Sequence, residues 1–164
     1  VAAGTHRTPG VDPADAAEMV ETLVGLEPAR YDSTLAAMHG RAALYSRYRA
    51  AATAGDQVGM RVYLLLAFVA VARVDAATME SFSSDVLPLY RAQADTLLAA
   101  LRANPWLTDT ICYFLGHGFE FEGRDPADRP AFIGAESDRI RSALHKRHAA
   151  RCFDQIEQPH RPAP

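Results

Sequence analysis

The sequence predicts an all-α protein, an irregular bundle of about six helices packed around one central apolar helix. Apolar residues recur every three or four positions through most of the chain, which is the spacing of one face of an α-helix. Hydrophobic residues make up 49% of the 164 residues and charged residues 23%, a composition that supports a globular core. Only one long, uniformly apolar run is present, so a buried strand would lack a second strand to pair with.

Two helices are expected in the first third of the chain. Asp12 is a suitable cap for the first helix, which runs to about residue 24, and Pro13 fits its first turn. One apolar stripe follows this helix: Ala16, Met19, Val20, Leu23 and Val24. The second helix runs over about residues 28–54 and is expected to end at Gly55.

The third expected helix covers about residues 56–79 and contains the apolar run VYLLLAFVAVA. A helix that is apolar on every side belongs at the centre of a bundle. We therefore expect four of its side chains to be almost wholly removed from solvent: Leu65, Phe68, Val69 and Ala72.

Three more helices are expected in the second half. The fourth begins at Ser83 or Ser84, with Pro88 tolerated in its first turn, and ends at Asn104. A short fifth helix starts at residue 105 or 106 and ends at residue 115. A loop over residues 116–130 leads to one final helix over residues 132–158. The whole forms a single domain, residues 13–158, between flexible tails at residues 1–12 and 159–164.

Composition excludes several classes of protein. The net charge of −3 argues against a nucleic-acid binder, which needs a basic face. The apolar run of residues 62–72 is shorter than the ~20 residues that span a bilayer. The first dozen residues lack the apolar core of a signal peptide, and Cys112 and Cys152 are expected to be reduced and unpaired. A cytoplasmic protein without a membrane partner is the resulting expectation.

Common catalytic motifs are missing from the sequence. It contains no phosphate loop, no dinucleotide-binding fingerprint, and no HExxH, GxSxG or paired CxxC. The expectation is therefore a protein without a cofactor and without a metal site.

The segment GHGFEFEG, residues 116–123, is the most unusual in the chain. Glycines on both sides of His117 allow uncommon backbone conformations or the close approach of a ligand. His117 with Glu120 or Glu122 could exchange a proton or contact a ligand, so His117 and Glu120 are candidate catalytic residues. The alternative is a solvated connection whose phenylalanines close the end of the bundle.

Polar side chains on otherwise apolar helices give a second group of candidates. His39 is a further candidate catalytic residue. Candidate ligand-binding residues are Tyr45, Tyr63, Tyr90 and Tyr113, together with Arg41. Tyrosine combines an apolar ring with a hydroxyl, which suits a pocket for a small organic molecule. The alternative is that these are core rings whose hydroxyls reach the surface.

The last expected helix is the one basic segment. Between residues 132 and 151, five basic residues outnumber two acidic ones, so this surface could dock an acidic partner. His145, His148 and Cys152 lie at i, i+3 and i+7, and their side chains are of the zinc-binding types. Three such ligands are fewer than a structural zinc site uses, which favours a solvated polar face.

Three functions fit these observations. The leading interpretation is a small-molecule-binding helical domain with a Tyr-lined interior pocket, for which a regulatory role is suitable. One alternative is a small cofactor-free or metal-assisted enzyme that uses His39 or His117 with a nearby carboxylate. The other is a protein-interaction module that uses the basic last helix. A homodimer is compatible with all three, and whether the protein is an enzyme stays open.

Overall fold

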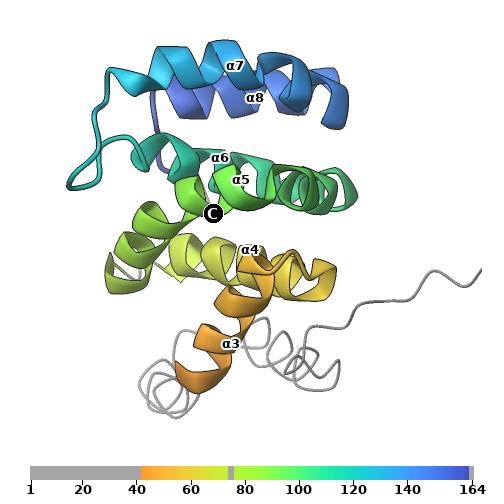
Figure 1. Ribbon diagram of the computed structural model, residues 1–164, viewed down its shortest axis with the longest axis vertical. Coiled ribbons are helices and arrows are strands. Elements are labelled where there is room, and N and C mark those ends of the chain that lie inside the picture. Colours follow the sequence, from red (N-terminus) through yellow and green to blue (C-terminus); the bar gives the residue numbers. More distant parts are fainter. Residues whose placement is uncertain (1–41, 74–75, 163–164) are drawn as a thin grey trace, which may run out of the picture. The chain divides into compact units, whose positions relative to one another are not determined.

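The computed structural model describes residues 42–73 and 76–162 (Figure 1). These residues form six α-helices and one short 3₁₀ helix, without a strand, which confirms the predicted all-α class. The chain divides into two compact units, residues 1–66 and 67–164. The interpretation of residues 13–158 as a single domain stays a prediction. The expected helix over residues 12–24 and the tail before it lie outside the described residues.

The elements keep the labels of Figure 1. In chain order they are α3 (Ala42–Thr53), α4 (Gln57–Arg73), α5 (Ala76–Ala103), η2 (Pro105–Leu107), α6 (Thr108–His117), α7 (Asp128–Ala143) and α8 (Lys146–Glu157).

The turn between α3 and α4 follows the predicted pattern. After α3 ends, Gly55 takes a φ of +82°, a left-handed conformation that glycine adopts without steric cost. The Asp56 carboxylate then accepts a hydrogen bond from the Gly59 N–H at 2.6 Å and caps the start of α4. A Cβ at Gly59 would lie 2.5 Å from the Cβ of Ala51, so the two helices cross closely at this glycine.

Helix α4 is less uniformly buried than its composition predicts. Tyr63, Leu64 and Ala67 are fully buried, but Leu65 and Phe68 are only half-buried. The prediction that these two side chains are almost wholly removed from solvent is therefore wrong. Uniform apolarity reveals which residues can be buried, whereas packing partners decide which are. The side chains of Val69 and Ala72 lie outside the description.

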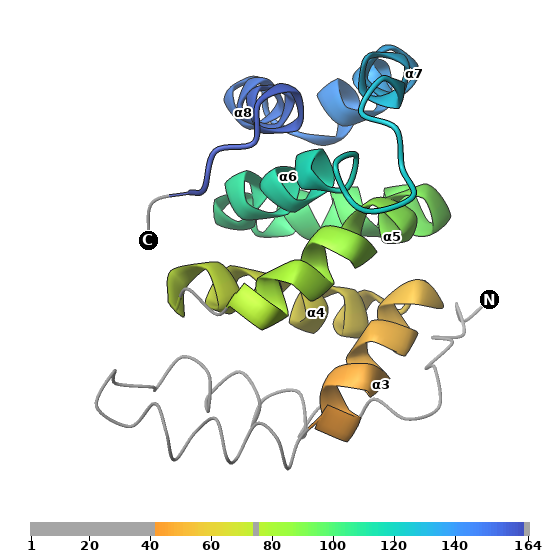
Figure 2. The same cartoon turned by 90° about the vertical axis from the view of Figure 1, so that its left-hand side faces the viewer.

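The unit of residues 67–164 has two layers, one formed by α5 and α6 and the other by α7 and α8 (Figures 1 and 2). Helix α6 packs against both α5 and α8. Eight of its ten residues are buried, namely Thr108 and residues 110–116. Within this unit α6 is the central helix.

Helix α5 begins at Ala76, about two turns before the predicted start at Ser83 or Ser84. The serines are interior positions, because the Ser83 hydroxyl donates back to the Met79 carbonyl at 3.0 Å. Pro88 therefore lies inside the helix, where its missing N–H leaves the Ser84 carbonyl without a helical donor. The Arg124 guanidinium donates to that carbonyl at 2.6 Å instead. A kink with non-helical φ and ψ follows at Gln93.

The segment predicted as one helix over residues 132–158 is two helices. Leu144 and His145 take extended backbone conformations, with ψ of 150° and 147°, and separate α7 from α8. This break lets α8 turn back beside α7, and both helices then bury apolar residues, Ile140 in α7 and Ile156 in α8. His145 precedes α8, so the expected single helical face of His145, His148 and Cys152 does not form.

The connection before α7 is shorter than predicted, residues 118–127, because His117 is the last residue of α6 and α7 already begins at Asp128. It contacts the rest of the unit at its start and in its middle. Phe119 is buried, and Arg124 donates to the Gly118 carbonyl at 3.0 Å.

Residues 159–162 contact other parts of the same unit, and the flexible tail expected over residues 159–164 stays a prediction. The His160 N–H donates to the Gln155 side-chain oxygen at 2.8 Å, and Arg161 donates to the Val71 carbonyl at 3.3 Å. Pro162 is buried. These contacts join distant parts of the chain, which a local composition rich in Pro does not reveal.

Helices of bilayer-spanning length and apolarity are absent from the part of the chain that the structure describes.

Candidate functional site

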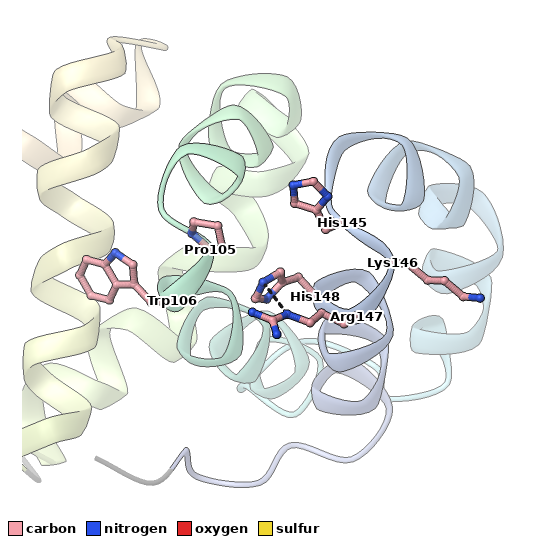
Figure 3. A pocket seen from close by; sticks show the side chains of 6 residues that line it. All are labelled: Pro105, Trp106, His145, Lys146, Arg147 and His148. Carbon is pink, nitrogen blue, oxygen red and sulfur yellow. Dashed lines mark hydrogen bonds between the residues drawn. The ribbon is translucent and has the colours of Figure 1, made fainter.

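An open groove lies between the 3₁₀ helix η2 and the start of α8 (Figure 3). Its volume is about 870 Å³, and it is lined by Pro105, Trp106, His145, Lys146, Arg147 and His148. The chain's single tryptophan, Trp106, is 53% exposed, and its ring meets the Phe68 ring edge-on at 5.0 Å. Single exposed apolar residues are common on protein surfaces, so Trp106 marks a candidate contact surface only together with the other residues that line the groove.

Two cationic residues, Lys146 and Arg147, lie on the α8 side of the groove, whose walls are mainly apolar. Arg147 Nε donates to His148 Nε2 at 3.3 Å, while the Lys146 side chain extends away from the other five (Figure 3). Among the described residues, no ion pair joins Lys146 or Arg147 to a carboxylate. These two charges are thus free to attract an anionic group.

The position of these cations in their helix is unfavourable for folding. The first turn of α8 contains no acidic residue, and His145 at its N-cap makes no side-chain capping bond. The N-terminal end of a helix carries a partial positive charge, which favours acids and disfavours Lys and Arg. Residues that are unfavourable for the local fold and make no compensating contact are candidates for a functional role.

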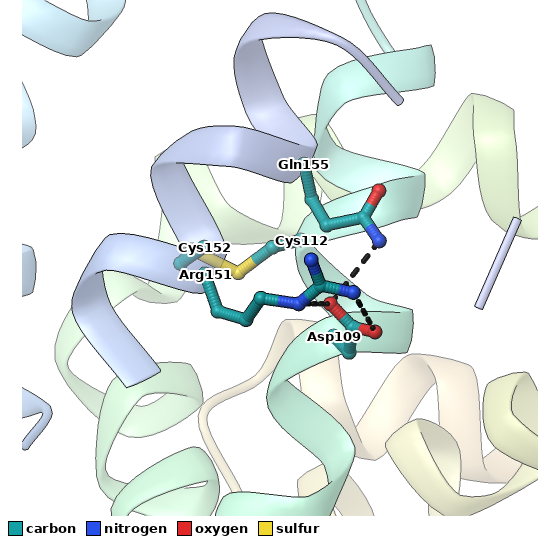
Figure 4. Close-up of a disulfide and its surroundings, with 5 residues drawn as sticks. All are labelled: Asp109, Cys112, Arg151, Cys152 and Gln155. Atoms are coloured by element: carbon teal, nitrogen blue, oxygen red, sulfur yellow. Dashed lines mark hydrogen bonds and ion pairs between the residues drawn. A yellow bond between two sulfur atoms is a disulfide. The ribbon is translucent and has the colours of Figure 1, made fainter. Parts of the chain in front are cut away.

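Helix α8 is fixed to α6 by a covalent bond and a polar cluster (Figure 4). Cys112 and Cys152 form a disulfide, with their Cα atoms 5.1 Å apart. Asp109 accepts from Arg151 and from Gln155, each at 3.1 Å. These contacts join α8 to α6 from Arg151 onward, about one turn after the groove residues at the start of the helix.

The disulfide overturns the prediction that both cysteines are reduced. The packing of α6 on α8 brings two thiols together that lie 40 residues apart in sequence, and a low cysteine count does not exclude such a pair. Because stable disulfides are typical of oxidising compartments, this finding also removes one of the reasons for expecting a cytoplasmic protein.

A second cluster surrounds His117 at the end of α6. His117 Nδ1 lies 3.3 Å from Glu120 Oε2, and Arg129 pairs with the other oxygen of Glu120 at 2.7 Å. The Tyr113 ring meets the imidazole edge-on, with centroids 4.5 Å apart. The structure thus brings together His117, Glu120 and Tyr113, whereas Glu122 is exposed and takes no part in these contacts.

The glycines beside His117 serve packing rather than flexibility. A Cβ at Gly116 would lie 2.5 Å from the Gln155 carbonyl oxygen, and one at Gly118 would lie 2.6 Å from the Cβ of Leu87. Gly118 has an ordinary helical φ of −55°. The interpretation that these glycines permit unusual conformations or ligand approach is wrong, because neighbouring helices occupy the space.

The electrostatics of this cluster limit its chemistry. Burial raises the pKa of Tyr113; Arg161 lowers it by a smaller amount, and Glu120 adds to the rise. The Tyr113 phenol therefore stays neutral near pH 7 and is not a base. Arg129 is occupied by Glu120 and by the carbonyls of Gly116 and Glu157. Within the pair, His117 is about one-third exposed and Glu120 is 45% exposed, so a solvent molecule can reach both side chains.

The remaining candidate residues are placed apart from this cluster. Tyr90 is buried and donates to Glu136 at 2.9 Å, and burial together with this carboxylate raises its pKa. Tyr63 is buried in the unit of residues 1–66. Tyr45 belongs to α3, with its side chain outside the description. His39 and Arg41 lie outside the described residues.

No group of three or more potential ligands that could hold a metal ion occurs within residues 42–73 and 76–162. The constellation of His145, His148 and Cys152 loses its sulfur ligand, because the Cys152 thiol is consumed in the disulfide.

Sequence reasoning missed Pro105 and Trp106 as site residues. The one signal for them is a lone tryptophan directly after a helix-ending Asn-Pro pair. Comparison with protein-family models, curated proteins and solved structures finds no match to this chain.

Proposed function

We propose that this protein is an interaction module that binds an acidic segment of a partner protein in the groove between η2 and α8. The observation that carries the proposal is the half-exposed Trp106 in the same groove as Arg147, whose charge, like that of Lys146, has no carboxylate partner among the described residues. An aromatic anchor and an arginine are the residue types that dominate binding at protein interfaces.

The openness of the groove favours a peptide over a small molecule. Small-molecule sites bury most of the surface of their ligand, which requires an enclosed cavity. An open groove suits an extended or helical segment that leaves one side in water. Exposed charge pairs contribute at most about 1 kcal/mol each, so we expect modest affinity, with a Kd of about 10–100 μM.

Trp106 provides a direct test, because the chain contains no other tryptophan. A peptide with several Glu residues around one Leu or Phe should shift the Trp106 emission and saturate it. The same peptide with Lys in place of Glu should not. Binding should weaken when NaCl rises from about 50 to about 500 mM, because salt screens exposed charges.

Matched variants test whether the acidic peptide binds in the groove. Lys146→Gln with Arg147→Gln should weaken binding about tenfold, whereas Arg91→Gln with Arg102→Gln, two exposed cations of α5, should leave it unchanged. Equal loss in both double variants would show that only net charge matters. No response of Trp106 to any acidic peptide would overturn the proposal.

The Tyr-lined small-molecule pocket has less support than the groove. The Tyr90 hydroxyl is bonded to Glu136, and Tyr113 packs against His117 and Phe114, so each tyrosine already has its own neighbours. A small organic ligand and a cytoplasmic location stay proposals.

The His117–Glu120 pair favours a second candidate function, an enzyme with a proton-transferring imidazole. A carboxylate 3.3 Å from Nδ1 fixes the proton there and leaves Nε2 as the acceptor. Acylation by diethyl pyrocarbonate, followed by mass spectrometry, measures this reactivity. His117 should react faster than the exposed His160, and Glu120→Gln should slow it while Glu122→Gln does not. Equal rates for His117 in all three proteins would exclude an activated imidazole.

A further inference from the structure

We infer that the acidic partner is a second copy of this chain, whose residues 12–27 occupy the groove. The inference rests on the proposed function, and it names the occupant of the same site. It would make the protein a reciprocal homodimer, in which each copy supplies one acidic segment and one groove.

Charge distribution along the chain points to this occupant. Residues 12–27, DPADAAEMVETLVGLE, contain five acidic residues and no basic residue, a net charge of −5. The whole chain has a net charge of −3, so all other residues together carry +2. The chain thus contains both an acidic segment and a groove with two cations that have no carboxylate partner within residues 42–73 and 76–162.

The apolar residues of the segment match the aromatic side of the groove. The expected stripe of residues 12–24 includes Met19 and Leu23, flexible side chains of a size that covers an exposed indole. Glu18 and Glu21 lie on either side of Met19 in sequence, so the segment combines apolar and acidic side chains as the groove combines apolar and cationic ones. An amphipathic acidic segment laid in a groove is an established mode of peptide recognition.

Closed symmetry explains why such a contact can be stable. Each segment-to-groove contact relies on exposed charges and is weak alone. In a two-fold dimer the same contact forms twice, and the first raises the effective concentration for the second. A second copy is therefore a more effective partner for this groove than a single acidic peptide.

The full chain tests the inference by sedimentation equilibrium across a range of protein concentrations. We expect a concentration-dependent dimer that salt weakens. Glu18→Gln with Glu21→Gln should weaken it about tenfold, as should Lys146→Gln with Arg147→Gln. The matched control, Glu122→Gln with Asp138→Asn, changes two exposed acids elsewhere and should have no effect.

Charge reversal gives the most direct test of the contact between segment and groove. A chain with Lys146→Glu and Arg147→Glu should be monomeric, and so should a chain with Glu18→Lys and Glu21→Lys. In a mixture of the two, the acidic segment of the first chain meets the basic groove of the second, and the lysines of the second meet the glutamates of the first. Both contacts are then complementary in charge, and association should be recovered as a heterodimer.

Failure of the dimer inference and failure of the proposed function give different results. A monomer at all concentrations, whose Trp106 still responds to a foreign acidic peptide, would overturn the second copy as partner and leave the proposed function standing. A dimer whose association is unchanged in both double variants would also overturn the second copy as partner in this groove. A groove that binds neither a foreign acidic peptide nor residues 12–27 as a peptide would overturn both the second copy as partner and the proposed function.

Discussion

At the scale of single residues, three glycines of the same unit differ in what surrounds them. Gly116 and Gly118 are packed against α8 and α5, whereas a Cβ at Gly134 would meet nothing within 4 Å. Gly116→Ala and Gly118→Ala should each lower the free energy of unfolding by about 1–3 kcal/mol through overpacking. Gly134→Ala should raise it by about 0.5–1 kcal/mol, because alanine favours a helix.

Urea unfolding of the three variants measures these effects. The opposite signs make Gly134→Ala an internal control for the general preference of helices for alanine. Stabilisation by all three substitutions would show that α8 and α5 do not lie close to the glycines.

Tyr90 should make stability depend on pH in the alkaline range. Its pKa is raised by burial and by the bond to Glu136, so the folded state keeps a proton that the unfolded state loses above about pH 10. The folded protein then binds more protons, and stability falls by at most about 1.4 kcal/mol per pH unit. The stability from this proton is present below about pH 10 and lost above it.

Tyr90→Phe removes both the hydrogen bond and the titration. At about pH 8 the variant should be less stable than the parent by about 1–2 kcal/mol, and this difference should vanish near pH 11. Chemical unfolding at the two pH values measures it. Parallel pH profiles would mean that the hydroxyl is not held beside Glu136.

At the scale of helices, Pro88 and Arg124 form a compensating pair. Arg124 donates to the Ser84 carbonyl, which loses its helical donor because Pro88 has no N–H. Arg124→Gln should lower the free energy of unfolding by about 1–3 kcal/mol, and it should cost less in a Pro88→Ala background, where the alanine N–H serves Ser84. A double-mutant cycle should give a coupling of about 1 kcal/mol.

Arg91→Gln changes an exposed residue of α5, the helix that contains Pro88, and is the control for charge removal. Its free energy of unfolding should lie within about 0.5 kcal/mol of that of the parent. Additive effects of the Pro88 and Arg124 substitutions would contradict the compensation.

Helices were predictable from the sequence where a local signal marks them. The end of α3 near Gly55 follows from a glycine with positive φ. The break at Leu144 and His145 carries neither Gly nor Pro, and it forms because α8 packs back on α7 and α6, which no local pattern reveals. The start of α5 was missed because serines fit both a cap and a helix interior.

The same distinction separates the two candidate sites. His117 and Glu120 are three residues apart, so their contact follows from local geometry and was predictable. The groove joins Pro105 and Trp106 to residues about 40 positions later, and only the packing of α8 against α6 brings them together.

At the scale of the whole molecule, the unit of residues 67–164 is closed by contacts between segments distant in sequence. Arg161 reaches Val71 near the beginning of this unit, and Cys112 joins Cys152 across its two layers. Asp109 adds polar bonds to Arg151 and Gln155 on the same face of α8. These contacts join the middle and end of α8 to α6, and they thereby orient the helix whose start lines the groove.

The disulfide gives the last prediction. Titration of the denatured, unreduced protein should find no free thiol, and reduction should release two. A cross-link between residues 40 apart restricts the unfolded chain and stabilises the folded one by about 4 kcal/mol in the chain-entropy treatment. Cys112→Ser with Cys152→Ser should therefore lower the free energy of unfolding by up to this amount. Because Asp109 still binds Arg151 and Gln155, the variant should keep its helical circular dichroism and its Trp106 emission. Two free thiols in the unreduced parent would refute the pairing, and an unchanged free energy of unfolding would show that the bond restricts the chain little.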